Sequence, residues 1–418
     1  MRKQIVTIFI LLNIIRVSAQ NPTSITVHME STGKEEVIDI PEGMQTAMSL
    51  DSLYWNWQDK NFLSPGENCQ MSSANPKVSD SIYIDRLSRI PTMIEMPYNE
   101  AVRKFIDMYA TRLRNNVAYM LAAGNFYIPI FEEALDLYDL PIELKYLPVI
   151  ESSFNPRAVS RQGATGLWQF MLGTGKIYGL QSNSLVDDRR DPVKSTWAAV
   201  RYLKDLYDIY KDWNLVLAAY NCGPGRINKA IHRAGGSTDF WQIYDYLPRE
   251  TRGYVPAFIA ANYIMTYYCE HNICPLETKL PPATDTIYVN KNLHLQQIAD
   301  VCKLDIDQLR GLNPQYKKDI IPGNTELSCV RLPQTHISTF IDMQDSIFAY
   351  KKDQYLSKRA IVKLKNVESS KGRLYHRIRN GENLGSISRK YGVSVKTLRR
   401  LNNMRNNNIR AGRKLRIR

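Results

Sequence analysis

Residues 147–171 read LPVIESSFNPRAVSRQGATGLWQFM and contain one acidic side chain, Glu151. In a helix, Leu144, Leu147, Pro148 and Glu151 share one face, because the later three follow Leu144 by three, four and seven positions. A carboxylate at the end of an apolar stripe loses contact with water, which raises its pKa. A general acid that works near neutral pH needs such a raised pKa. The pattern predicts Glu151 as a catalytic acid, with a helix cap or a surface salt bridge as the structural alternative.

The same helical spacing of apolar residues recurs on both sides of this stretch, in residues 99–122 and 195–210. Asp191 and Pro192 precede the second run as an N-cap and a first helical residue would. These patterns predict an all-helical domain over residues 98–280.

Two segments near the C-terminus repeat each other at a constant offset. The apolar and asparagine positions that match are Leu295, Ile298, Cys302, Leu304, Ile306, Leu309, Leu312 and Asn313 with Leu384, Ile387, Tyr391, Val393, Val395, Leu398, Leu401 and Asn402. The pattern of each repeat predicts a strand, two short helices and a closing strand. The two repeats would form small α+β (βααβ) modules over residues 286–333 and 374–418. Residues 334–373 read as a linker, although FIDMQDSIFAY within them has the pattern of a short amphipathic helix.

The N-terminus predicts export. Residues 1–19 hold Arg2 and Lys3 ahead of an apolar run and end in small residues, as a cleaved signal peptide does. An uncleaved membrane anchor is the alternative, but the run is shorter than the roughly 20 residues that a spanning helix needs. Residues 20–97 show few periodic runs and read as an irregular approach segment.

Positive charge is concentrated at the C-terminus. The chain carries a net charge of +14, and 19 Lys or Arg residues lie from Lys358 onward against only Glu368 and Glu382. For an exported protein, such a tail favours contact with an anionic wall or membrane surface over a nucleic-acid partner. The expected location is the periplasm or cell envelope, with membrane association left open.

The six cysteines suggest disulfides rather than a metal site. No CxxC spacing indicates structural zinc, and no cofactor is expected. Cys302 and Cys329 fall in the first repeat at a core position and on its closing strand, so a bond between them is one hypothesis. A bond between Cys269 and Cys274 is another.

Three ordered motifs carry a family resemblance. Residues 151–171, AAYNCGPGR at 218–226 and RETRGYVP at 249–256 together resemble the lytic murein transglycosylases, most closely the membrane-bound D-like group, in which an SLT domain precedes C-terminal LysM modules. Residues 375–402 resemble a LysM module independently. The resemblance implies a lysozyme-like fold that cleaves the β-1,4 bond between N-acetylmuramic acid and N-acetylglucosamine of peptidoglycan without water, giving 1,6-anhydromuramoyl products.

The resemblance also implies roles for single residues. Glu151 matches the one catalytic residue, which acts first as acid and then as base. Matched positions of the glycan groove are Ser160, Gln169, Met171, Tyr220, Asn221, Glu250 and Tyr254. The turn of the second module, which would bind glycan, comprises Gly381, Glu382, Asn383 and Leu384.

The sequence departs from the family pattern in two places. Cys222 stands where a small residue is common, and we interpret it as a small buried side chain because no histidine is near it in the sequence. The first repeat has NKNLHL where the LysM turn has its glycine, so the resemblance leaves glycan binding by this repeat open. The glycines of the motifs, Gly163, Gly166, Gly223 and Gly225, are expected to set turns.

Two other functions remain open from sequence. A hydrolytic muramidase of the goose-lysozyme type would need a second carboxylate, for which Asp187, Asp188 and Asp191 are candidates. A non-catalytic peptidoglycan-binding protein would need none of these groups, and the intact motifs argue against it.

Overall fold

The computed structural model describes residues 22–29, 33–49, 63–65, 75–278, 280–356, 375–391, 393–404 and 406–417. The expected signal peptide at residues 1–19 lies outside them. Within the described ranges, no helix is long and apolar enough to cross a membrane.

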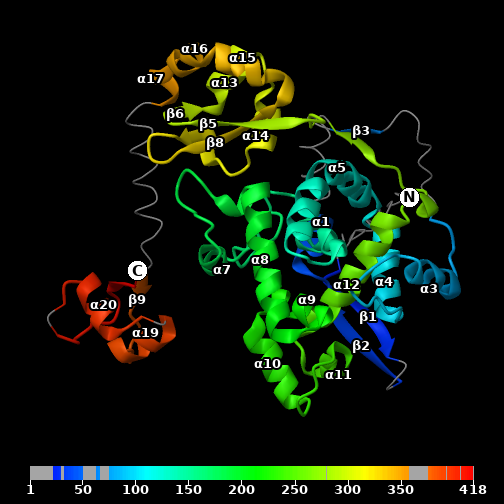
Figure 1. Ribbon diagram of the computed structural model, residues 1–418. Helices are drawn as coiled ribbons and strands as arrows, with labels where there is room; N and C mark the ends of the chain where they lie inside the picture. Colours follow the sequence, from blue (N-terminus) through cyan, green and yellow to red (C-terminus); the bar gives the residue numbers. More distant parts are fainter. Residues whose placement is uncertain are drawn as a thin grey trace, which may run out of the picture.

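Residues 100–271 form a helical domain, drawn in cyan to green in Figure 1. Its α-helices are α4 (Glu100–Ala110), α5 (Arg114–Leu137), α6 (Leu147–Ser152), α7 (Leu172–Ile177), α8 (Pro192–Tyr210), α9 (Trp213–Cys222), α10 (Pro224–Arg233), α11 (Phe240–Ile243) and α12 (Arg249–Thr266). Short 3-10 turns join them: η1 (Ile142–Tyr146), η2 (Asp188–Arg190), η3 (Tyr244–Tyr246) and η4 (Cys269–His271). The predicted cap of α8 is confirmed, since Asp191 accepts hydrogen bonds from the backbone N–H groups of Val193 and Lys194.

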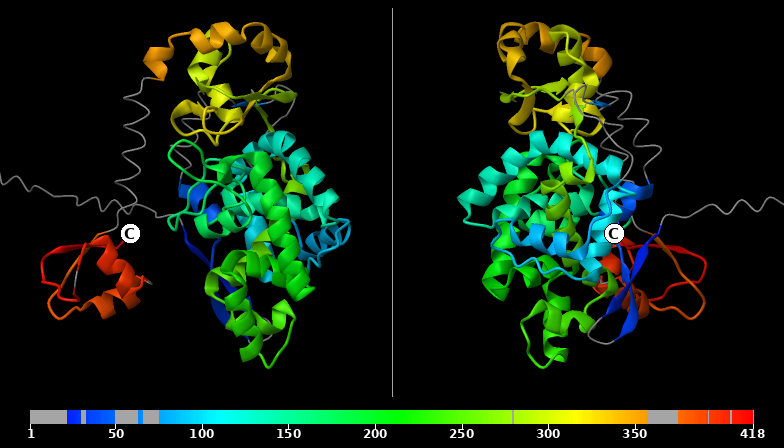
Figure 2. Two further views of the ribbon diagram at one scale, coloured as in Figure 1. Left: turned by 60° about the vertical axis from the view of Figure 1, so that its left-hand side comes forward. Right: turned by 90° about the vertical axis from the view of Figure 1, so that its right-hand side faces the viewer.

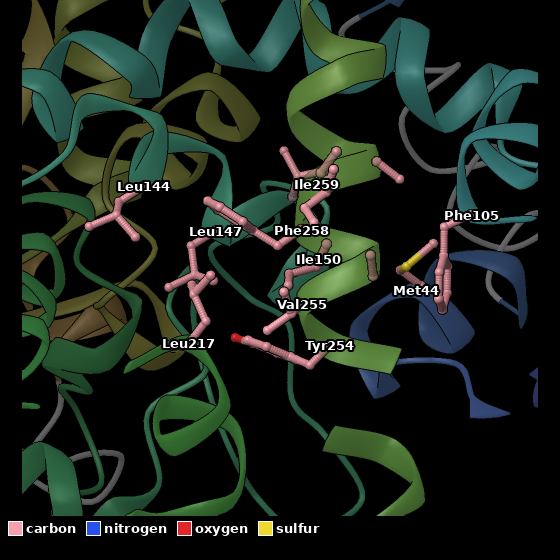
Figure 3. Close-up of a cluster of buried hydrophobic side chains, with 14 of the residues drawn as sticks. Met44, Phe105, Leu144, Leu147, Ile150, Leu217, Tyr254, Val255, Phe258 and Ile259 are labelled. Atoms are coloured by element: carbon pink, nitrogen blue, oxygen red, sulfur yellow. The ribbon is translucent and has the colours of Figure 1, made fainter. Parts of the chain in front are cut away.

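Helix α12 is the centre of this domain, because it packs against α4, α6 and α9. It is apolar on nearly every side, as a helix surrounded by others must be. Figure 3 shows the part of the core where α6 and α12 meet, with Ile150 and Val255 among its buried side chains. The catalytic-acid candidate therefore stands on a short helix held by the most buried element of the domain.

The described part of the N-terminal segment is folded, which is more order than the irregular, partly ordered segment expected at 20–97. Strands β1 (Ser24–Met29) and β2 (Lys34–Asp39) form an antiparallel hairpin, and helices α1 (Glu42–Ser49) and α3 (Asp80–Ser88) follow. Ile38 and Met44 are buried in the same core as α12. A further strand, β3 (Leu63–Pro65), pairs with β4 (Leu276–Thr278) beyond the helical domain. These elements are short and separated by polar residues, so the sequence shows no sustained apolar periodicity that would have predicted them.

The first repeat forms the expected α+β module. Strand β5 (Thr284–Val289) pairs with β8 (Ser328–Pro333), and β6 (Asn292–His294) pairs with β7 (Ile320–Pro322). Between them lie α13 (Leu295–Cys302), α14 (Ile306–Leu312) and the turn η5 (Lys317–Asp319). Both views of Figure 2 show this module, in yellow, seated on one end of the helical domain.

The expected linker at 334–373 is wrong for residues 334–356. The turn η6 (Gln334–His336) and helices α15 (Ile337–Asp342), α16 (Gln344–Ala349) and α17 (Lys352–Tyr355) continue the module. Phe340 and Ile347 are fully buried in its hydrophobic cluster. The amphipathic pattern of FIDMQDSIFAY reflects this packing, and polar residues on the other face of these helices gave the appearance of a tether.

The second repeat has the same architecture with a cluster of its own. Strands β9 (Tyr375–Arg377) and β10 (Lys414–Arg416) pair around α19 (Leu384–Tyr391) and α20 (Val395–Leu401). The repeated asparagine has the same task in both modules. Asn313 exchanges two hydrogen bonds with the backbone of Arg331, each 2.8 Å, and Asn402 does so with Arg416, each 2.7 Å. The side chain fixes the closing strand to the second helix.

Both disulfide hypotheses are wrong. Cys269, Cys302 and Cys329 are free thiols, and so is Cys222. Cys274 is in a disulfide whose partner lies outside the described residues.

Candidate active site

A pocket of about 290 Å³ opens above α6, and every predicted residue of the catalytic domain lines it. These residues come from α6, the loop before α7, α9 and α12, and they are Glu151, Ser160, Gln169, Met171, Tyr220, Asn221, Glu250 and Tyr254. A second pocket of about 150 Å³ shares Glu151, Ser160 and Gln169 with the first. The three sequence motifs therefore meet in one groove with Glu151 at its base.

Helix α6 ends directly after Glu151, and its end is strained. Ser153 and Phe154 have φ values of 50° and 57°, a left-handed conformation that side chains rarely adopt. Phe154 is fully buried and Ser152 binds the carbonyl of Leu167 at 2.8 Å. Packing thus enforces the sharp exit from α6, as expected where strain is stored at a functional site. The apolar stripe is present too, since Leu144 and Leu147 are fully buried, although η1 replaces the first turn of the expected helix.

The pKa of Glu151 is raised from 4.5 to about 8, chiefly by burial. The negative charges of Glu250 and Glu42 contribute to this rise, and a hydrogen bond from the hydroxyl of Tyr254 to the carboxylate opposes it. With such a pKa, most Glu151 side chains are protonated at neutral pH. The proton that a general acid needs is therefore available where the substrate would lie.

Glu42 and Gly43 of α1 also line the groove, and sequence analysis missed both. A Cβ atom on Gly43 would lie 2.2 Å from the backbone oxygen of Glu151 and 2.3 Å from that of Ile150, so only glycine allows α1 to lie on α6. Glu42 accepts a hydrogen bond from the backbone N–H of Arg161 at 2.7 Å. No local signal joins residues so far apart in the chain, and only the fold reveals this wall.

Tyr220 supports the groove from α9. Its hydroxyl donates to the carbonyl of Trp168 at 2.7 Å, and its ring packs at 5.2 Å from that of Tyr202. Burial raises the pKa of Tyr220 well above its ordinary value, so the hydroxyl stays protonated. On the next residue, the amide oxygen of Asn221 accepts from the hydroxyl of Thr251 at 2.8 Å, which ties α9 to α12.

Residues 157–171, the groove loop, form the opposite wall. The hydroxyl of Ser160 accepts from the N–H groups of Gln162 and Ala164, each at 3.2 Å, and holds the turn. Gln169 has a φ of 46° and donates its amide to the carbonyl of Gly166 at 2.8 Å. Met171 is 44% exposed at the rim. The loop offers fixed polar groups and one apolar edge to a ligand.

The three aspartates considered as a second catalytic carboxylate have other tasks. Asp187 is bound by Arg189, Asp188 pairs with Lys194 at 3.0 Å, and Asp191 caps α8. None of them lines either pocket. The carboxylates that share the groove with Glu151 are instead Glu42 and Glu250.

Cys222 lines the pocket beside Asn221, and its pKa is raised, mainly by burial. A raised pKa reduces the thiolate fraction, and only the thiolate is a good nucleophile. The arrangement agrees with a packing role for Cys222. Gly163, Gly166 and Gly223 have φ values of 87°, 89° and 84°, as expected for turn glycines, whereas Gly225 lies in the first turn of α10, after Pro224, and has no positive φ.

In the second module, the predicted glycan turn is held by its own side chains. Glu382 accepts from the backbone of Arg379 at 2.7 Å and is hydrogen-bonded to His376 at 2.6 Å. Asn383 accepts from the N–H of Ser386 at 2.8 Å, and Gly381 has a φ of 84°. Leu384 is 2% exposed, so its side chain belongs to the module core. Gly381 and Asn383 are exposed, whereas Glu382 is half-buried.

Family models match three parts of the chain. They describe a transglycosylase SLT domain at residues 129–242, the LysM-like domain of lytic transglycosylase MltD at 283–349, and a LysM domain at 376–418. This organisation confirms the predicted fold class, a mainly α lysozyme-like domain followed by small α+β modules of the LysM type. The SLT match ends before α12, so Glu250 and Tyr254 lie beyond it.

Two related sequences agree with these matches. The chain is 31% identical to the membrane-bound lytic murein transglycosylase D of Escherichia coli K12 over 283 residues, which are 67% of this chain and 60% of that protein. It is 32% identical to the soluble lytic murein transglycosylase of the same strain over 124 residues, 28% of this chain and 19% of that one. The crystal structure of the 70 kDa soluble lytic transglycosylase of E. coli matches with a TM-score of 0.30 and 27% identity, over 35% of this chain and 25% of that one. The order and content of its domains place the chain in the lytic murein transglycosylase family, among members with LysM-type modules.

Proposed function

We propose that the protein cleaves the β-1,4 bond between N-acetylmuramic acid and N-acetylglucosamine in peptidoglycan and releases 1,6-anhydromuramoyl products without consuming water. The observation that carries the proposal is the raised pKa of Glu151 together with its position in the groove. It is a carboxyl group with a pKa of about 8, placed at the base of a groove and hydrogen-bonded to a tyrosine hydroxyl.

In the proposed reaction, Glu151 plays both proton-transfer roles. Its carboxyl proton passes to the glycosidic oxygen as the bond from that oxygen to C1 of the muramic acid breaks. The C6 hydroxyl of the same sugar then bonds to C1, and the Glu151 carboxylate accepts the hydroxyl proton. The residue ends protonated, as it began, so the cycle needs neither water nor a second acid.

The other carboxylates of the groove fit supporting roles. Glu42 is bound to the backbone of Arg161, and Glu250 is hydrogen-bonded by the side chain of Asn221. Burial and the negative charge of Glu42 raise the pKa of Glu250. Both carboxylates already accept hydrogen bonds from the protein, which a base that activates a water molecule would have to share with that water. These contacts favour the water-free route over a hydrolytic muramidase.

Mass spectrometry of the products separates the two routes. Purified peptidoglycan is digested with the full-length protein, and soluble fragments are compared with those from a muramidase that adds water. The proposal predicts products lighter by one water molecule than their hydrolytic counterparts. Glu151→Gln is the matched inactive control. Products of hydrolytic mass would contradict the water-free route, and no release at all would favour a non-catalytic binding protein.

We also propose that the second module attaches the enzyme to peptidoglycan. The match to a LysM domain covers residues 376–418, which also contain most of the basic surplus. Proposed contacts are the turn at Gly381 to Leu384 for glycan and the surrounding Lys and Arg side chains for anionic wall or membrane components. Export to the periplasm or cell envelope is part of this proposal.

A further inference from the structure

The loop before α8 is built into the first LysM-like module. Leu185 and Val186 are buried in the hydrophobic cluster of the module, although they belong to the helical domain in sequence. Val186 forms an antiparallel bridge with Tyr316. Two backbone hydrogen bonds complete the contact, from Asp187 to the carbonyl of Gln315 at 3.0 Å and from Lys317 to the carbonyl of Leu185 at 2.7 Å. Figure 1 shows this loop, in green, reaching up to the module.

A chain of charged side chains, Lys317, Asp187 and Arg189, connects this contact to the groove loop. The Nζ atom of Lys317 lies 3.6 Å from Oδ2 of Asp187. Asp187 is 2% exposed and accepts from both Nε and Nη2 of Arg189, each at 2.9 Å. A paired arrangement of this kind fixes the plane of the guanidinium group. Lys317 of the module thus contributes to the charge balance of a buried pair in the catalytic domain.

Arg189 in turn holds the groove loop. Its Nη1 atom donates to the carbonyl of Gly163 at 3.0 Å and to that of Phe170 at 3.1 Å. Gly166 packs directly against the backbone of Arg189. A Cβ atom added at Gly166 would be 1.8 Å from the carbonyl oxygen of Arg189. The loop between these anchor points carries Gln169, whose strained φ needs external support.

We propose that the first LysM-like module is a brace for the active site, in which Lys317, Asp187 and Arg189 act as positioning residues for the groove loop. The module has lost the glycine of the glycan-binding turn but has kept its fold, and one of its lysines now supports the wall that carries Ser160 and Gln169. None of the three positioning residues lines the pocket. The effect on substrate rests on the proposed function, whereas the effect on loop order does not.

Hydrogen exchange of the full chain tests the brace without any assay of activity. The reporter is residues 157–171, whose N–H groups bond within the loop from Ser160 to Ala164 and between Thr165 and Phe170. Lys317→Met removes the charge and keeps the length of the side chain. Lys318→Met is the matched control, because Lys318 is adjacent and exposed. We expect faster exchange of the loop in Lys317→Met and Asp187→Asn, wild-type exchange in Lys318→Met, and rescue by Lys317→Arg.

Kinetics on soluble peptidoglycan fragments provide the second readout. A lost ion pair of this kind should raise KM about two- to fivefold in Lys317→Met, with a smaller change in kcat. Arg189→Lys, which cannot form the paired contact, should raise KM more. Glu151→Gln should abolish turnover with loop exchange unchanged, so failure of the proposed reaction and failure of the brace are distinguishable. Equal loop exchange in Lys317→Met and Lys318→Met, with the module still folded, would overturn the proposal.

Discussion

The hydroxyl of Tyr254 donates a hydrogen bond to the carboxylate of Glu151, across 103 positions of sequence. Two effects oppose each other at this carboxylate. Burial raises its pKa, whereas the tyrosine stabilises the charged form and lowers the pKa. The pKa of about 8 is the balance of the two, so the acid strength of Glu151 depends on the alignment of α6 with α12.

Removing the hydroxyl should shift this balance. In Tyr254→Phe, the pKa of Glu151 should rise further, and the alkaline limb of the kcat/KM profile should move to higher pH. The rate at the optimum should fall by about tenfold, because a hydrogen bond to a charged group is lost from the step in which Glu151 is anionic. Tyr267→Phe is the control, since that hydroxyl bonds the carbonyl of Arg86 instead. An unchanged limb in Tyr254→Phe would contradict the role of this bond.

Neutralising a neighbouring carboxylate should act in the opposite direction. The negative charge of Glu250 raises the pKa of Glu151. Glu250→Gln should therefore lower that pKa, and the alkaline limb should move to lower pH. Glu270→Gln, at an exposed position outside the groove, is the control. Profiles should be measured at low salt, where charge effects are largest; a shift of the limb to higher pH would refute this electrostatic account.

Replacing Glu151, the proposed catalytic acid, should remove turnover and add stability at high pH. The folded protein raises the pKa of Glu151 from 4.5 to about 8, so the unfolded chain releases this proton first as pH rises. Wild-type stability should fall between those values, by about 1.4 kcal/mol for each pKa unit of the shift. Glu151→Gln avoids the loss, because its amide does not ionise. Thermal unfolding should show a gain in Tm for the variant at pH 8 and none at pH 4. A gain that is the same at both pH values would have another cause.

The contact of α1 with α6 gives a prediction about folding. In Gly43→Ala, the added methyl group meets backbone oxygens of Glu151 and Ile150 at distances no side chain tolerates. Either α1 moves away or α6 shifts, and both changes open the groove. We expect a loss of about 2 kcal/mol or more in the free energy of unfolding, together with a strong loss of activity. Gly225→Ala, at a helical position with open space, is the control. Wild-type stability and activity in Gly43→Ala would show that the helices do not meet as described.

Wall attachment should depend mainly on the second module. A chain that ends at residue 356 keeps the catalytic domain and the whole first module. It should sediment with purified peptidoglycan much less than the full chain, while its turnover of soluble fragments stays similar. Binding by the full chain should weaken as salt rises, because exposed charges are screened beyond about 8 Å at physiological ionic strength. Equal sedimentation of the two chains would move the wall-binding role to the first module.

Sequence patterns predicted those features of the structure that depend on residues close together in the chain. The apolar stripe that ends in Glu151, the cap at Asp191 and the repeat with its asparagine each follow from local spacing, and all are present in the structure. Every groove residue that the family resemblance predicted lines the pocket, but other residues of the same segments, such as Ile150, Gln162 and Phe170, line it as well and were not predicted.

What sequence missed depends on distance along the chain. Glu42 and Gly43 lie more than a hundred residues from Glu151, and the helix that holds them is too short for a strong pattern. Leu185 and Val186 fall within the helical domain predicted over residues 98–280, yet their side chains belong to the core of the first LysM-like module. The disulfide hypotheses failed for the same reason, since position along the chain does not show which thiols approach each other.

The wall built by α1 determines where the protein can be shortened. Glu42, at the start of α1, directly follows the hairpin of β1 and β2, in a region that would be trimmed first if domain limits were taken from the SLT match at residues 129–242. Such a truncation would keep every catalytic motif and still remove one side of the groove, together with the contacts of β2 on α12. Low activity in a trimmed enzyme would then be an effect of the trimming, and affinity tags placed before β1 need a spacer that leaves the hairpin free to fold against α12.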